Sequence, residues 1–226
     1  MPDLLSFLSS FLFSHTIEER KSDVSGKVEV LYSNGKYILD SANVNYSFGG
    51  LHTVFRKAFA QFGIKQRNIK SVLILGFGSG SVASILQEEY GKYMEITGVE
   101  KDPAVIELAK KYFSIDKYKK LSLHCADAYD FVMKTSLPVF DLIVVDVFVD
   151  LFVPEKFQEE KFLIALSKLL PEQGILFYNF IARDEKTRDT GGKLFKLLNS
   201  LIGKTEWVRL FAKSTENWVF VSIKNP

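Results

Sequence analysis

The chain has 226 residues, of which 47% are hydrophobic and 25% charged, and its formal net charge is +2. This composition is typical of a globular protein with a sizeable core, and the length suits one domain with a small appendage. Because acidic and basic residues are mixed along the chain, charge gives no argument for nucleic acid or an anionic membrane as a partner. The lone cysteine, Cys125, excludes an intrachain disulfide, favours a reducing, cytoplasmic location and is expected to be a packed small side chain.

The first fourteen residues are apolar, but the run is too short to span a bilayer and lacks the marks of a signal peptide. Leucine and phenylalanine recur in it at roughly helical spacing, which predicts an amphipathic helix packed on the body or on a second subunit. Alternating apolar residues over 27–46, with a turn at Ser33-Asn34-Gly35, predict a β-hairpin. We therefore expect residues 1–50 to form an appendage made of a helix and a β-hairpin.

Residues 51–226 alternate between helical and extended patterns, which predicts one Rossmann-like domain. Strands are expected at 71–75, 95–99, 121–124, 141–145, 175–179, 207–212 and 218–223. Helices are expected at 51–62, 81–90, from 103, and at 129–135, 156–170 and 192–201. The link between the last two strands is too short for a parallel crossover, so they should pair antiparallel. The predicted fold is a doubly wound α/β domain with a mostly parallel sheet and a terminal antiparallel hairpin.

Three glycines, Gly76, Gly78 and Gly80, lie between the predicted strand 71–75 and the helix that follows. At such a place the backbone turns sharply, and a ligand can approach the helix amides without interference from Cβ atoms. Glu100 ends the next strand, where a carboxylate can accept hydrogen bonds from both hydroxyls of a ribose. The spacing is Gly-x-Gly-x-Gly, and a serine stands at position 81, where a dinucleotide fingerprint has its third glycine.

A second acid, Asp127, follows the third predicted strand of the domain and is followed by Ala128. The Asp127 carboxylate can accept from an adenine amino group, and the Ala128 amide can donate to the ring. An Asp at this place is also a common helix cap, so that structural role remains the alternative.

These motifs together resemble class I S-adenosylmethionine-dependent methyltransferases and, more narrowly, the spermidine synthase group within them, over roughly residues 27–224. The runs that carry the likeness are 72–80 (VLILGFGSG), 98–103 (GVEKDP), Asp127-Ala128 and 140–146 (FDLIVVD). The resemblance implies S-adenosylmethionine or its decarboxylated form as cofactor, a small-molecule acceptor and a homodimer, which the apolar N-terminal region also favours. It assigns cofactor contacts to Gly76, Phe77, Gly78, Ser79, Gly80, Glu100, Lys101, Asp127, Ala128 and Asp146.

The sequence departs from the spermidine synthase pattern at the residues that choose the substrates. The family loop Gly-Gly-Gly-Asp-Gly has an acid near the cationic end of the decarboxylated cofactor, and Ser79 stands there in this chain. A neutral residue suits the carboxylate of ordinary S-adenosylmethionine better. The family's Asp-Ser-Ser-Asp-Pro is replaced by 146–150 (DVFVD), and the Gln-Glu that usually follows the tyrosine corresponding to Tyr46 is replaced by Ser-Phe. The diamine site is therefore not preserved.

Asp146, at the end of a predicted strand, is the candidate catalytic residue, because it could take a proton from the acceptor or orient it. A structural capping role for Asp146 is the alternative. Tyr46, His52 and Asp150 are candidates for binding the acceptor. The histidines have no spacing that suggests a metal site. The leading hypothesis is a methyltransferase acting on a small acceptor; the alternatives are a polyamine aminopropyltransferase and a non-catalytic binding module.

Overall fold

The computed structural model describes residues 3–41, 45–47, 50–134, 136–149 and 151–226. Within these residues, seven strands form a sheet in the order β10-β11-β9-β8-β5-β6-β7. The parallel strands are β5 (Ser71–Leu75), β6 (Glu95–Glu100), β7 (Leu121–Cys125), β8 (Leu142–Val145) and β9 (Ile175–Ile181). The last two, β10 (Thr205–Ala212) and β11 (Thr215–Ile223), are antiparallel, and β11 lies between β9 and β10. The predicted Rossmann-like α/β fold with a terminal antiparallel hairpin is confirmed.

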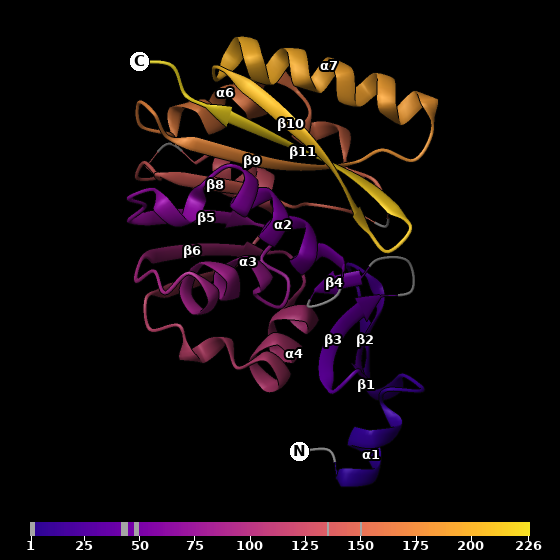
Figure 1. Cartoon of the computed structure of the whole chain (residues 1–226). Helices are drawn as coiled ribbons and strands as arrows, with labels where there is room; N and C mark the ends of the chain where they lie inside the picture. Colours follow the sequence, from indigo (N-terminus) through magenta and orange to yellow (C-terminus); the bar gives the residue numbers. More distant parts are fainter. Residues whose placement is uncertain (1–2, 42–44, 48–49, 135, 150) are drawn as a thin grey trace.

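Helices cover both faces of this sheet (Figure 1). One face packs against α2 (Gly50–Gln61), α3 (Ser81–Ser84) and α4 (Pro103–Phe113), and the other against α5 (Ala128–Val132), α6 (Glu160–Lys168) and α7 (Glu185–Leu201). Successive side chains of β5 alternate between the two cores: Val72 and Ile74 enter the first, Leu73 and Leu75 the second. Burial on both faces explains why this strand is a continuous apolar run. None of the helices in the described ranges has the length and apolar character needed to cross a membrane.

An N-terminal antiparallel sheet lies beside α4 and is built from β1 (His15–Ser22), β2 (Gly26–Ser33), β3 (Lys36–Ser41) and β4 (Asn45–Ser47) (Figure 1). Only the β2–β3 hairpin was expected. The sequence of β1, HTIEERKS, is largely polar, and only its last residue, Ser22, is buried. Val28, Val30 and Leu39 are fully buried and share a core with α2 and α4. The boundary at residue 50 stays a prediction.

Several helix boundaries differ from the expected ones. The N-terminal helix α1 is short (Leu4–Ser9), and it leaves Leu4, Leu5 and Leu8 more than half exposed, so they do not pack on the body. The expected helix 81–90 is α3 followed by a π-helical turn, Ile85–Glu89. The expected helix 156–170 is a 3₁₀ turn, Glu155–Phe157, followed by α6. Two further 3₁₀ turns are Ile64–Gln66 and Ile115–Lys117.

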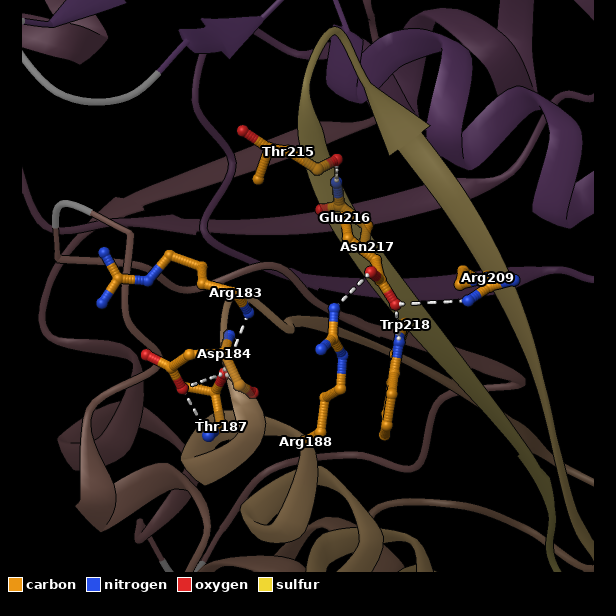
Figure 2. Close-up of polar contacts among 9 residues, drawn as sticks. All are labelled: Arg183, Asp184, Thr187, Arg188, Arg209, Thr215, Glu216, Asn217 and Trp218. Atoms are coloured by element: carbon orange, nitrogen blue, oxygen red, sulfur yellow. Dashed lines mark hydrogen bonds and ion pairs between the residues drawn. The ribbon is translucent and has the colours of Figure 1, made fainter.

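Helix α7 begins at Glu185, seven residues before the predicted start at residue 192, because a capping box holds its first turn (Figure 2). Asp184 accepts from the Thr187 amide at 2.8 Å, and Thr187 Oγ1 accepts from the Asp184 amide at 3.0 Å. One turn further on, Arg188 donates to Glu216 of β11 at 3.1 Å, and Trp218 Nε1 donates to the same carboxylate at 2.7 Å. The first residues of α7 are polar and are followed by a glycine pair, so this part of the helix has no apolar periodicity from which it could be predicted.

Candidate active site

A pocket of about 480 Å³ opens at the carboxyl ends of β5, β6 and β8. It lies where the chain order reverses between β5 and β8, the place at which open parallel sheets bind ligands. Seven predicted site residues line it: Gly76, Gly78, Glu100, Lys101, Asp127, Ala128 and Asp146. Residues that sequence reasoning missed also line it, among them Asp23, Val24, Leu51, Pro154, Lys156 and Phe157.

Gly76 is needed at its position because the loop after β5 passes against the segment that follows β8. Its φ is +83°, and a Cβ atom added there would lie 2.1 Å from the Asp146 carbonyl oxygen. The Asp146 amide in turn donates to the Leu75 carbonyl at 2.8 Å. A residue with a side chain would therefore push the two strand ends apart at the floor of the pocket.

Glu100, the last residue of β6, is held by two backbone donors. Its Oε2 accepts from the Gly78 amide at 2.9 Å, and its Oε1 accepts from the Asp102 amide at 3.0 Å. Burial raises the pKa of this carboxyl above its ordinary value, although the two amides counteract the effect. The side chain is 7% exposed and lines the pocket, so its orientation is fixed before any ligand arrives.

Asp127 combines the two roles considered for it, because it caps α5 and also lines the pocket. Its carboxylate accepts from the Tyr129 amide at 2.9 Å, and both of its oxygens lie 2.8 Å from Lys156 Nζ. Lys101 Nζ lies 3.2 Å from Asp127 Oδ2. Burial alone would raise the pKa of Asp127, but the lysines outweigh it and hold that pKa below its ordinary value. A single lysine carries no motif, which is why Lys156 was missed.

Asp146 follows β8 and is held from the neighbouring strand β9 by Asn179. Asn179 is fully buried, and its Nδ2 donates to Asp146 Oδ1 at 2.9 Å. Burial raises the pKa of Asp146 to about 7, and the Glu100 carboxylate adds to the rise, while the bond from Asn179 opposes it. A carboxyl group with this pKa can accept or donate a proton near neutral pH.

Other predicted site residues do not line this pocket. Ser79 and Phe77 are buried, and Gly80 packs against Ile115 and Phe77. His52 faces a second, wider groove beside the N-terminal sheet, where its Nε2 lies 2.7 Å from Glu89 Oε1.

Asp150 and the side chain of Tyr46 lie outside the described residues, although Tyr46 itself is in β4. Cys125, expected to be packed, is exposed at the end of edge strand β7. No group of three or more metal-ligating side chains occurs in the part of the chain that the structure describes.

Residues 56–182 match the family described as the Spermine/spermidine synthase domain. The chain is 34% identical to the polyamine aminopropyltransferase of Vibrio vulnificus over 111 residues, which are 48% of this chain and 36% of that protein. It is 26% identical to the human eEF1A lysine and N-terminal methyltransferase over 131 residues, 53% of this chain and 19% of that protein. The chain thus spans well under half the length of either curated relative.

Solved structures with this fold include both a probable spermidine synthase and a methyltransferase-like protein. A probable spermidine synthase from Corynebacterium glutamicum superposes with a TM-score of 0.73 at 16% identity, covering 93% of this chain and 80% of that one. Human methyltransferase-like protein 13 in complex with SAH superposes with a TM-score of 0.63 at 23% identity, covering 76% of this chain and 82% of that one. With its family match extending over more than half of the sequence, the chain belongs to the spermine/spermidine synthase domain family.

Proposed function

We propose that this protein is an S-adenosylmethionine-dependent methyltransferase that acts on a small acceptor. The cofactor part of the proposal is supported by the pocket that joins Gly76, Gly78, Glu100, Asp127 and Asp146. Its volume of about 480 Å³ lies in the range of small-molecule sites. Gly76 and Gly78 of the glycine loop line this pocket, so a bound adenosyl group would lie against their backbone.

The donor set of the pocket suits an adenosyl group. Glu100 is fixed by two amides, and each of its oxygens keeps a lone pair that can accept from a ribose hydroxyl. Asp127, whose lowered pKa keeps it ionised, can accept from the adenine amino group, beside the Ala128 amide. When bound, S-adenosylmethionine would supply an electrophilic methyl group on a sulfonium centre.

The observation that favours methyl transfer over aminopropyl transfer is the apolar lining of the pocket beyond Asp146, called here the apolar wall. Val147, Phe148 and Val149 follow it directly along the pocket lining, and Pro154 and Phe157 complete that part of the lining. A diamine carries two ammonium groups, and an ammonium group loses hydration against such a wall without gaining a partner. The acceptor we propose therefore has at most one amine near Asp146 and is otherwise neutral.

Asp146 has two tasks in this proposal. Its carboxylate orients the attacking atom, and near its pKa of about 7 it can accept the proton which that atom releases. Most of the rate of a displacement of this kind comes from holding the nucleophile in line with the transferred carbon.

Calorimetry with the two cofactors tests the proposal. S-adenosylmethionine should bind the wild-type protein at least as tightly as the decarboxylated form does. Glu100→Gln should weaken both, and Glu95→Gln, at the exposed start of the same strand, should weaken neither. Tight binding of the decarboxylated cofactor with none of S-adenosylmethionine would contradict methyl transfer.

The alternative is a polyamine aminopropyltransferase, favoured by the 34% identity with the Vibrio vulnificus enzyme. Formation of spermidine from putrescine and the decarboxylated cofactor would establish that activity and overturn our preference. A non-catalytic binding module predicts cofactor binding but no turnover that Asp146→Asn could abolish.

A further inference from the structure

The turn between β1 and β2 reaches the cofactor pocket. Asp23 and Val24, at the tip of this turn, line the pocket together with Glu100 and Lys101. Ser22 holds the shape of the turn, because its Oγ accepts from the Val24 amide at 3.0 Å and from the Ser25 amide at 2.9 Å. The N-terminal sheet is thus a wall of the site as well as a cover for the hydrophobic core.

Two serine hydroxyls of this turn bind one buried carboxylate. Ser22 Oγ and Ser25 Oγ donate to Asp102 Oδ2 at 2.5 and 2.8 Å. Asp102 is 1% exposed and Ser22 is 6% exposed, so the bond between them is shielded from water, and the bond from Ser25 is partly buried. Among the described side chains no lysine or arginine forms an ion pair with Asp102. Hydroxyl and amide donors therefore satisfy the carboxylate, and removing them would leave a buried charge poorly solvated.

Asp102 connects the turn to Glu100. Its backbone amide donates to Glu100 Oε1 at 3.0 Å, and its Oδ1 accepts from the Ala104 amide at 2.9 Å and so caps α4. One residue therefore binds the serines with one oxygen, starts a helix with the other and holds Glu100 with its backbone. A displacement of Asp102 would move one of the two amides that orient the Glu100 carboxylate.

Other residues of β1 are attached to α4 by side-chain contacts. Glu18 accepts from Lys111 Nζ at 2.5 Å and from the Tyr112 hydroxyl at 2.6 Å, and Arg20 pairs with Glu107. These outer contacts are more exposed than the serine contacts and keep the sheet docked on α4. They do not reach Glu100. These contacts therefore dock the sheet without positioning the Glu100 carboxylate.

We infer that Ser22 and Ser25 are positioning residues that, through Asp102, orient Glu100 toward a ribose diol. The inference rests on the proposed function in one respect, that the pocket binds an adenosyl group. A merely structural role for the serines predicts lower stability with an unchanged choice of ligand. A positioning role predicts a change in how strongly the pocket distinguishes a ribose with hydroxyls from one without them.

The test measures this distinction by calorimetry with 5′-methylthioadenosine and its 2′,3′-dideoxy analogue. Both methyl and aminopropyl donors contain this nucleoside, so the result does not depend on the group transferred. The wild type should prefer the diol by about tenfold or more, and the double variant Ser22→Ala/Ser25→Ala should retain at most about threefold. Glu100→Gln, included for comparison, should lose the preference in the same way.

Ser10→Ala is the matched control. Ser10 is 1% exposed, donates to the Phe7 carbonyl at 2.7 Å and accepts from the Gly35 amide at 3.0 Å, so it is a buried serine of the N-terminal region with no contact to Asp102. Its variant should keep the wild-type preference. If the double variant does not fold, the single variants Ser22→Ala and Ser25→Ala, each retaining one hydroxyl on Asp102, should each lower the preference.

A folded serine variant with the wild-type preference would overturn the positioning role and leave the proposed function intact. A wild-type protein that binds neither nucleoside would overturn the proposed function, and the inference with it. An equal loss of preference in Ser10→Ala would also overturn the inference, because the effect would then follow from any loosening of the N-terminal region.

Discussion

Asn179 of β9 donates a hydrogen bond to Asp146, which follows the neighbouring strand β8, with 2.9 Å between Nδ2 and Oδ1. A buried amide thereby holds the carboxyl group whose pKa burial raises to about 7. The bond favours the ionised form, so the pair sets how much carboxylate is present at neutral pH.

Asn179→Leu should raise the pKa of Asp146 further, because it removes the group that favours the carboxylate. We expect an upward shift of about one pH unit in the titration of the Asp146 carboxyl carbon, followed by NMR. Asn217→Leu is the control, since Asn217 is also fully buried but lies on β11 and donates to the Thr215 carbonyl at 3.0 Å. Equal titration of the two variants would contradict this role of Asn179.

The raised pKa of Asp146 also makes folding depend on pH. Between its ordinary value of 3.8 and about 7, the folded protein keeps a proton that the unfolded chain has released. The contribution of this group to stability is therefore full below pH 3.8 and falls as the pH rises to about 7. Urea unfolding should show Asp146→Asn gaining on the wild type by up to about 4 kcal/mol across this window. Parallel stability curves for the two proteins would rule this out.

Gly76→Ala should destabilise the protein by about 2–4 kcal/mol, because the residue has a positive φ and its new methyl group would meet the Asp146 carbonyl. Gly192→Ala is the matched control. Gly192 lies within α7, and an added Cβ has no heavy atom within 4 Å. That variant should gain about 0.5–1 kcal/mol from helix propensity. Denaturant unfolding should give shifts of opposite sign for the two variants.

Asp184→Ala should cost about 1 kcal/mol, because it removes the acceptor that caps α7 (Figure 2). In a protein of this length that loss corresponds to a fall in Tm of about 2–4 °C. Asp189→Ala, at an exposed position inside the same helix, should leave Tm nearly unchanged. An equal fall in Tm in both variants, measured by scanning calorimetry, would show that the capping box does not contribute to stability.

The parts of the site that were predictable from the sequence are those in which neighbours along the chain act together. The β5 strand, the glycine loop, the helix after it and the acid that ends β6 form one β–α–β unit, and their spacing is fixed by local geometry. The alternation of strand-like and helical segments likewise predicted the mostly parallel sheet.

What could not be predicted depends on contacts between distant parts of the chain. Asp23 reaches the pocket only because β1 docks on α4, and Lys156 reaches Asp127 only because the segment after β8 folds back over the pocket. Ser79 was expected to face the ligand, but its side chain is buried and does not line the pocket. The strand β1 was missed because its largely polar sequence has no apolar alternation to detect.

The position of β11 between β9 and β10 has a consequence for folding during synthesis. Until residues 215–223 have left the ribosome, the fully buried strand β9 (ILFYNFI) has one unpaired edge. An apolar edge of this kind pairs readily with other chains. A nascent chain that stalls just before Thr215 would therefore present an aggregation-prone β edge, although the residues that line the pocket have already been synthesised.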